Sequence, residues 1–221
     1  MRAAALAGFL PSTAGFRFAN RWPAGPAFEL KAPYLRLGIG EVADGLCGGM
    51  CYAAADRFLA GAGVPPEAEA PAAGSALFDE IARRQLDSLH FLAVVPLRFW
   101  TTAARVASHT WTAADQVREW RALRADIDAG RPAMAGLVRS ANVNPFALAH
   151  NHQVLGYAYE ASGAEARLRI YDPNHPLDDD VQVLVRRTTG PGEKPAFSLE
   201  QTTGEPLLAM LRLPYRPAPP G

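Results

Sequence analysis

The chain has 221 residues, of which 49% are apolar and 20% are charged, and its 22 basic residues balance its 22 acidic residues. This length allows one domain with a sizeable core, and the even charge gives no electrostatic reason to expect nucleic acid or a membrane surface as a partner. No apolar run is long enough to span a membrane. The two cysteines, Cys47 and Cys51, lie four residues apart, which excludes a disulfide framework and fits a reducing, cytoplasmic compartment.

The first 45 residues contain Pro, Gly and aromatic residues without a clear period. We interpret them as an extended lead segment that packs on the domain, because they are too few for a separate unit. The part from Arg2 to Leu10 is apolar but short, and Pro11 follows it. This favours a folded segment over a cleaved signal peptide, and it leaves secretion open as the alternative to the cytoplasm.

Three later segments, 50–61, 75–89 and 112–130, have the period of amphipathic helices. Ser75 and Thr112 are helix-capping residue types, and Asp115 stands where a capping box requires an acceptor. The segment 91–106 is ambiguous, and its aromatic residues indicate a buried crossing. The residues expected to face the core are Cys51, Ala54, Ala55, Phe58 and Leu59 in the first helix and Val117, Trp120, Leu123 and Ile127 in the third.

After Gly130 the apolar period changes to two, which is typical of strands in a half-buried sheet. The expected strands are 132–139, 152–160, 166–171, 181–187 and 206–213, with 197–201 as a weaker candidate. Helices followed by antiparallel strands predict an α+β fold. With no internal repeat and no domain boundary, we expect a single domain over residues 1–221. Its parts would be the lead segment (1–45), a mainly helical half (46–130) and an antiparallel sheet half (131–215).

The stretch 44–59 carries the strongest chemical signal. A Gly-rich approach leads to Cys47 at the start of the first helix, where free N–H groups and the helix dipole stabilise a thiolate. Thiol catalysis also needs an imidazole that takes the proton and a third group that orients the imidazole. His152 opens one expected strand and Asp172 closes the next, so an antiparallel hairpin would place these two side chains together.

Four short strings follow one another along the chain: Cys47-Gly48 with Cys51, Gly130-Arg131-Pro132, His152-Gln153-Val154-Leu155 and Ile170-Tyr171-Asp172-Pro173. Together they resemble papain-like cysteine peptidases, and most closely the double-glycine leader peptidase domains of bacteriocin exporters. The longer strings Gly-Leu-Cys-Gly-Gly-Met and Asn-His-Gln-Val-Leu also resemble a group of bacterial proteins of unassigned function. The resemblance implies a papain-like fold. It also implies a catalytic triad of Cys47, His152 and Asp172 that cleaves a peptide or small amide through a thioester, without a cofactor.

One position departs from the family pattern. The family has a glutamine six residues before the nucleophile, which donates a hydrogen bond to the oxyanion, and this chain has Glu41 there. A carboxylate donates only when it is protonated, and it repels a developing negative charge. The resemblance therefore implies a cleft near Glu41 and Asp44, with backbone N–H groups such as that of Gly48 forming a partial oxyanion hole.

Other interpretations remain open. Cys51 is the alternative nucleophile, because Gly49-Met50-Cys51-Tyr52-Ala53 resembles the Gly-Ser-Cys-Trp-Ala string of plant-type papain enzymes, although its place on the helix stripe indicates a core residue. The same triad would also serve an acyltransferase, and the fold without activity would serve as a binding module.

Metal binding is the third class considered. Cys47, Cys51, His150 and His152 form a set of zinc-ligand types, but their spacing is not that of a common zinc module. The run Asp178 to Asp180 lacks further alternating oxygen ligands, which favours a solvated turn over a calcium site. We therefore expect no metal.

Overall fold

The computed structural model describes the chain except residues 23–25, 33–34, 42–44, 145–150 and 190–194, and for 26–32, 35–41 and 90–93 it describes the backbone only. Its helices are α1 (Pro11–Ala14), α2 (Cys47–Ala60), α3 (Ala76–Ser88), α4 (His90–Ala107) and α5 (Ala113–Asp128). Its strands are β1 (Arg2–Ala5), β2 (Pro26–Ala32), β3 (Leu35–Glu41), β4 (Ala133–Val138), β5 (His152–Ser162), β6 (Glu165–Tyr171), β7 (Gln182–Thr189), β8 (Pro195–Gln201) and β9 (Ala209–Arg212).

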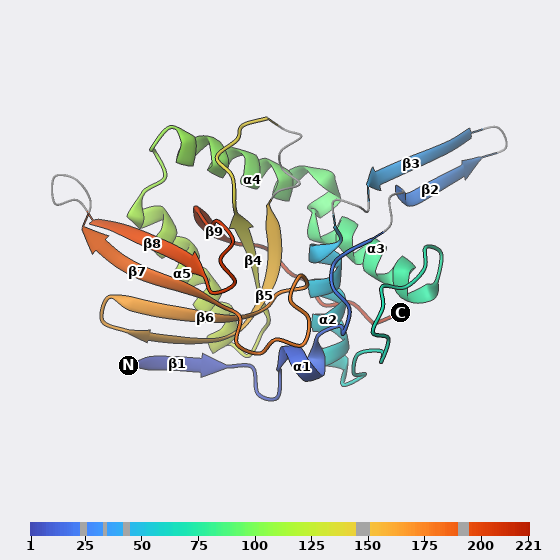
Figure 1. The fold of residues 1–221 in the computed structure, drawn as a ribbon, viewed down its shortest axis with the longest axis horizontal. Coiled ribbons are helices and arrows are strands. Elements are labelled where there is room, and N and C mark those ends of the chain that lie inside the picture. Colours follow the sequence, from blue (N-terminus) through green and yellow to red (C-terminus); the bar gives the residue numbers. More distant parts are fainter. Residues whose placement is uncertain (23–25, 33–34, 42–44, 145–150, 190–194) are drawn as a thin grey trace.

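The main sheet is antiparallel and has the order β8-β7-β6-β5-β4-β9, with β1 added on β5 (Figure 1). The long strand β5 pairs with β4 through its first residues, from His152 to Gly156, and with β1 through Ala158 to Ala161. A register shift in its pairing with β6 falls between Gly156 and Ala158, where the neighbour changes. The mixture of helices and antiparallel sheet confirms the predicted α+β class.

The helix ends follow the residue types that the sequence places there. Gly61 closes α2 in the left-handed region with φ of 65°, a conformation that glycine adopts without steric cost. The Ser75 Oγ accepts the N–H of Phe78 at 3.3 Å at the start of α3. At the start of α5, Thr112 and Asp115 form the predicted capping box. These three helices therefore begin and end within a few residues of their predicted bounds.

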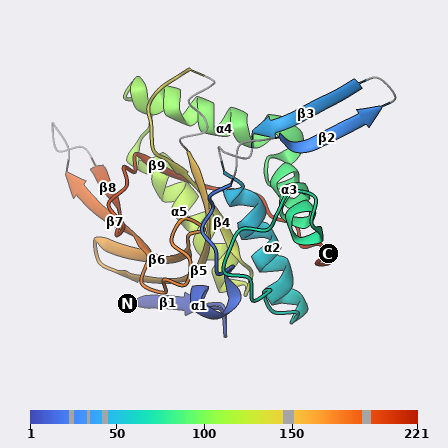
Figure 2. The ribbon, with the colours of Figure 1, turned by 45° about the vertical axis from the view of Figure 1, so that its right-hand side comes forward.

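Two apolar cores lie on the two faces of the sheet, because neighbouring residues of a strand point to opposite faces. Leu155 and Tyr171 belong to the core that includes α2, whereas Val154 and Ile170 belong to the core that includes Trp120 of α5. Figures 1 and 2 show α2 and α5 on different sides of the sheet. The central strands are therefore buried on both faces.

Two expectations about the first half of the chain were correct only in part. The lead segment is not merely extended: β1 joins the main sheet, α1 follows it, and β2 and β3 form a separate hairpin that projects from the body (Figures 1 and 2). The segment 91–106 lies within helix α4. Phe99 of this helix is buried, as the expected crossing requires, whereas Trp100 is 37% exposed and its indole N–H donates to the Val143 carbonyl.

Two residues of the expected inward stripes also face solvent. Leu59 in α2 is 44% exposed and Val117 in α5 is 36% exposed. Leu59 lies in the last turn of α2, next to the end of the helix at Ala60. Val117 borders a groove between α5 and the sheet, and no element of the described chain closes over it there. The remaining stripe residues are buried or half-buried.

None of the helices in the described part of the chain has both the length and the apolar character needed to cross a membrane.

Candidate active site

Cys47 is the first residue of α2, and the chain leading to it is held by a residue that the sequence analysis did not single out. The Asn20 Oδ1 accepts the backbone N–H of Leu46 at 2.7 Å and the indole N–H of Trp22 at 2.9 Å. Gly45, with φ of 94°, passes so close to Asn20 that a Cβ atom would lie 2.6 Å from the Asn20 Nδ2. The glycine therefore lets the chain turn into the helix against the asparagine.

The two glycines after Cys47 let α2 approach its neighbours closely. A Cβ atom on Gly48 would lie 2.2 Å from the Ser88 Oγ, and one on Gly49 would lie 2.1 Å from the Ile81 carbonyl oxygen. The backbone N–H of Gly49 donates to the Gln85 Oε1 at 2.7 Å. The Gly-Gly pair thus has a packing role against α3, in addition to leading into the helix.

His152 and Asp172 meet as the predicted hairpin requires. The His152 Nε2 donates to the Asp172 Oδ1 at 2.6 Å, and both side chains are buried. His152 is the first residue of β5, and Asp172 directly follows the last residue of β6, which pairs with β5 in antiparallel register. The turn between the strands lies at Gly163, whose φ of 58° suits a tight reversal.

The imidazole also contacts the thiol. His152 is close enough to Cys47 to act on the charge of its thiol, and because Nε2 is taken by Asp172, Nδ1 is the ring nitrogen left free to face the sulfur. Burial disfavours the Cys47 thiolate, but the charge and hydrogen bond of His152 and the N–H groups of Gln153 and Gly48 outweigh burial. The pKa of Cys47 is consequently lowered.

The charges on the other two residues follow the same logic. Burial opposes the protonated imidazole, but the negative charges of Asp172 and Cys47 raise the pKa of His152 to about 9. Burial likewise opposes the carboxylate, but His152, the Asn174 N–H and Arg139 lower the pKa of Asp172 to about 2. The three shifts therefore favour the ion pair of a Cys47 thiolate and a His152 imidazolium over the neutral pair, with the far side of the ring bound to a carboxylate.

Asp172 has further partners that the sequence did not reveal. Its Oδ2 accepts the side-chain N–H of Gln201 at 2.7 Å, and the Gln201 Oε1 in turn accepts from Arg139 at 3.0 Å. Its Oδ1 also accepts the backbone N–H of Asn174 at 2.8 Å. Gln201 is 1% exposed and closes β8, which was only a weaker strand candidate, so nothing in the local sequence marked it as a partner of the site.

Asn20 connects the two sides of the site. Its Nδ2 donates to the Asn174 Oδ1 at 3.2 Å, and its backbone N–H donates to the Pro173 carbonyl at 2.8 Å. The same side chain holds Leu46, which directly precedes Cys47. Asn20 therefore fixes the chain before Cys47 relative to the loop after Asp172. The only available signal was an asparagine among the aromatic residues of the lead segment.

Cys51 has a different environment from Cys47. It is fully buried, its S–H donates to the Gln153 carbonyl at 3.5 Å, and burial together with the negative charges of Cys47 and Asp172 raises its pKa well above the ordinary value. Cys47 retains 9% exposure. Of the two candidate nucleophiles, only Cys47 has both a histidine beside it among the described residues and some remaining exposure.

Three of the other predicted site residues are described in part or not at all. Glu41 is the last residue of β3, for which the structure describes the backbone only, whereas Asp44 and His150 lie outside the described residues. Within the described ranges, no three His, Cys, Asp or Glu side chains are grouped so that they could hold a metal ion. In the Asp178 to Asp180 run, Asp179 accepts from the N–H and the hydroxyl of Ser12, at 2.8 Å and 2.6 Å.

Comparison of the chain with protein-family models, with curated proteins and with solved structures found no match.

Proposed function

We propose that this protein is a papain-like thiol hydrolase that cleaves a peptide or small amide bond through a thioester on Cys47. The observation that carries the proposal is the buried chain of contacts from the Cys47 thiol through His152 to Asp172, in which the thiol has a lowered pKa. A thiolate with its own acid–base partner is what nucleophilic catalysis by cysteine requires. The resemblance of the four strings to papain-like peptidases supports the same assignment.

In the proposed reaction the Cys47 thiolate attacks the carbonyl carbon of the bound amide, and the imidazolium of His152 gives its proton to the leaving amine. Neutral His152 then takes a proton from water, which attacks the thioester and releases the acid. Asp172 holds the imidazole through Nε2, so Nδ1 stays directed at the sulfur throughout.

The oxyanion would be bound by backbone N–H groups at the start of α2. The N–H of Gly49 is taken by Gln85 and that of Met50 by the Leu46 carbonyl, while the N–H of Gly48 is directed at the sulfur of Cys47. Among the described residues, the Cys47 N–H has no acceptor, so it is the donor that a substrate carbonyl would find.

A catalytically silent binding module is the second candidate, and Glu41 favours it. In place of the family glutamine, a carboxylate would remove one oxyanion donor, and such a loss typically slows an enzyme by a factor of about 100 to 1,000. Transfer of the acyl group to an amine differs from hydrolysis only in the acceptor, and the same three residues would carry it.

The test is the pH dependence of iodoacetamide labelling at each cysteine, followed by mass spectrometry in the wild type and in His152→Ala. We expect Cys47 to label faster than Cys51 and to reach its half-maximal rate below pH 9. In His152→Ala the stabilising charge is lost while burial remains, so the pKa of Cys47 rises and labelling at pH 7.5 slows by about tenfold or more, since one pKa unit is a tenfold change in thiolate.

His175→Ala is the matched control. His175 also pairs with a carboxylate, with 2.8 Å between its Nε2 and the Glu205 Oε1, but it makes no contact with Cys47. Labelling in this variant should equal that of the wild type. Slow labelling of both cysteines with no effect of His152→Ala would reject the hydrolase and leave the binding module.

A further inference from the structure

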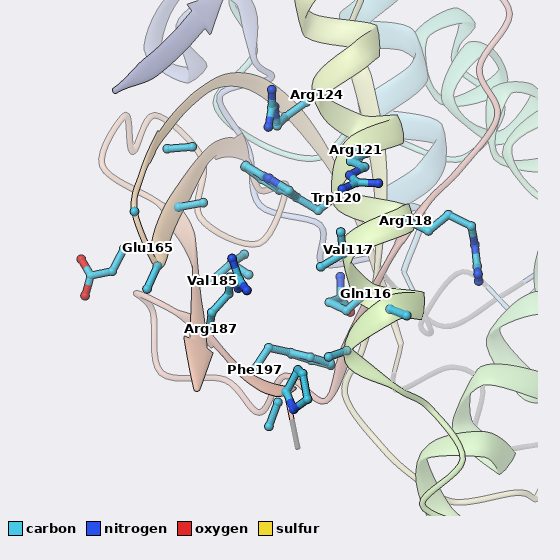
Figure 3. Close-up of a pocket in the computed structure, with 18 residues that line it drawn as sticks. Gln116, Val117, Arg118, Trp120, Arg121, Arg124, Glu165, Val185, Arg187 and Phe197 are labelled. Carbon is cyan, nitrogen blue, oxygen red and sulfur yellow. The ribbon is translucent and has the colours of Figure 1, made fainter. Parts of the chain in front are cut away.

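A concave region lies far from Cys47, between α5 and the edge of the sheet formed by β5 to β8 (Figure 3). Its volume is about 680 Å³, which is within the usual range for sites that enclose a small organic molecule. The part of β5 that lines it is Ala161, nine residues after His152. At about 3.3 Å per residue, the groove lies roughly 30 Å along the strand from the imidazole. A ligand there would not touch the thiol site.

The floor of this groove is apolar. Trp120 and Val117 of α5 face Val185 and Phe197 of the sheet across it (Figure 3). The Trp120 ring packs edge-on against Tyr159, with 5.9 Å between ring centroids, so its position is fixed by the core beneath. Val117 is 36% exposed, although the helix period predicts an inward position. The floor would therefore bury the apolar body of a ligand, and the removal of this apolar surface from water would favour binding.

The rim of the groove is positively charged. Arg121, Arg124 and Arg187 line it. Arg124 lies close enough to Asp128 for its charge to lower the pKa of that carboxyl, whereas among the described residues neither Arg121 nor Arg187 has a carboxylate partner. The Arg124 guanidinium lies 5.1 Å from the centre of the Tyr159 ring, and its Nε is buried without a hydrogen-bond acceptor. Among the described residues, Arg121 and Arg187 therefore leave an excess of positive charge beside an apolar floor.

The remaining charges at the groove do not cancel this excess. Arg118 points away from the groove and pairs with Asp115 at 2.9 Å (Figure 3). Glu165 is the acidic lining residue, and it points outward and pairs with Arg186 at 3.4 Å (Figure 3). A ligand that complements the groove must therefore bring its own negative charge together with an apolar body.

We infer that this groove binds a small amphipathic carboxylate, an organic acid with an aliphatic or aromatic body of about ten carbon atoms. The apolar body lies on Trp120, Val117 and Phe197. The carboxylate accepts charge-assisted hydrogen bonds from the guanidinium groups at the rim, for which arginine has the matching fork geometry. This site is independent of the chemistry proposed for Cys47.

Isothermal titration calorimetry with decanoate tests the inference, with decan-1-ol and acetate as probes that lack the charge or the apolar body. We expect saturable binding of decanoate, and binding at least about tenfold weaker for either of the other two. In Arg121→Gln/Arg187→Gln, decanoate should bind about tenfold or more weakly. The matched control is Arg17→Gln/Arg21→Gln, which removes the same charge from two exposed arginines outside the groove and should change the affinity less than about twofold.

A second pair of variants tests the floor. Val117→Glu and Val117→Gln have almost the same size, and the exposure of Val117 makes both compatible with folding. The glutamate should weaken decanoate binding about tenfold more than the glutamine, because it places a negative charge on the floor. The inference would be overturned if decanoate did not bind or if decan-1-ol bound with the same affinity as decanoate. It would also be overturned if the two Val117 variants weakened decanoate binding equally.

Discussion

Asp172 is the residue that sets the charge state of the candidate triad. It accepts hydrogen bonds from His152, Gln201 and the Asn174 N–H, and all of these favour the carboxylate form. The carboxylate in turn raises the pKa of His152 against the effect of burial. A positive imidazole then stabilises the Cys47 thiolate. The electrostatic chain therefore runs from the carboxylate to the sulfur, and each step depends on the previous one.

Asp172→Asn tests this dependence. The substitution removes the negative charge that raises the pKa of His152, while burial continues to lower it, so the imidazole should lose its proton about one to two pH units below the wild-type value of about 9. NMR titration of the histidine ring signals measures this value. Labelling of Cys47 at pH 7.5 should slow in the same variant.

Glu205→Gln is the control for that titration. Glu205 and His175 form a carboxylate–histidine pair outside the triad. The pair lies near the site, because the Glu205 Oε1 is 4.0 Å from the Arg139 Nη2. The titration of His152 should be the same as in the wild type. An unchanged His152 titration in Asp172→Asn would show that another group raises its pKa.

At the scale of elements, the contact between α2 and α3 positions the start of α2, which carries Cys47. The helices come close enough at Gly48 and Gly49 that neither has room for a side chain. The surroundings of the two differ, because Gly48 faces the ends of side chains from Ser88 and Gln153, whereas Gly49 faces the backbone of Ile81. Side-chain ends can rotate away, and a buried backbone cannot.

The two glycine-to-alanine variants should therefore differ. Both gain the same intrinsic helix propensity, so the comparison isolates packing. Gly49→Ala should lower the free energy of unfolding by about 2 to 3 kcal/mol, and Gly48→Ala by at least about 1 kcal/mol less than that. Urea denaturation of the two variants measures the difference. Equal losses would mean that α3 moves as a unit to accommodate either methyl group.

At the scale of the whole molecule, the two ends of the chain tie the helices and the sheet together. The N-terminal strand β1 pairs with β5 in the sheet, and the C-terminal segment 214–221 returns to α2 and α3. Asp56 of α2 anchors this segment by accepting the Tyr215 hydroxyl at 2.8 Å and the Ala218 N–H at 2.9 Å. It also pairs with Arg84 at 2.7 Å, and both side chains are buried.

Asp56→Asn should be among the most destabilising conservative changes in the chain. It leaves Arg84 buried with one charged partner removed, and breaking a buried pair typically costs about 3 to 5 kcal/mol of unfolding free energy. Asp87→Asn is the matched control, because Asp87 pairs with the same guanidinium at 2.7 Å but its side chain is 40% exposed. That change should cost about 1 kcal/mol or less in the same urea titration.

The sequence by itself determined the features that depend on short-range pattern. The caps at Ser75 and Thr112, the stop at Gly61 and the change of period after Gly130 predicted helices and strands within a few residues of their observed bounds. The sequence also predicted that Cys47, His152 and Asp172 come together, because the start of a helix and the ends of a hairpin have predictable neighbours. The secondary structure of the segment 91–106 could not be predicted, because its apolar residues fit a helix and a strand equally well.

Only the tertiary structure decided which distant residues complete the site. Gln201 reaches Asp172 because β8 lies at the end of a sheet order that no local pattern encodes, and Asn20 reaches Leu46 and Asn174 because the lead segment folds back between them. The exposure of Val117 was decided in the same way, since the helix period assigns it to the core and the edge of the sheet leaves it uncovered. Burial and hydrogen-bond partners at long sequence separation depend on how the elements pack, and periodicity records only which face of each element is apolar.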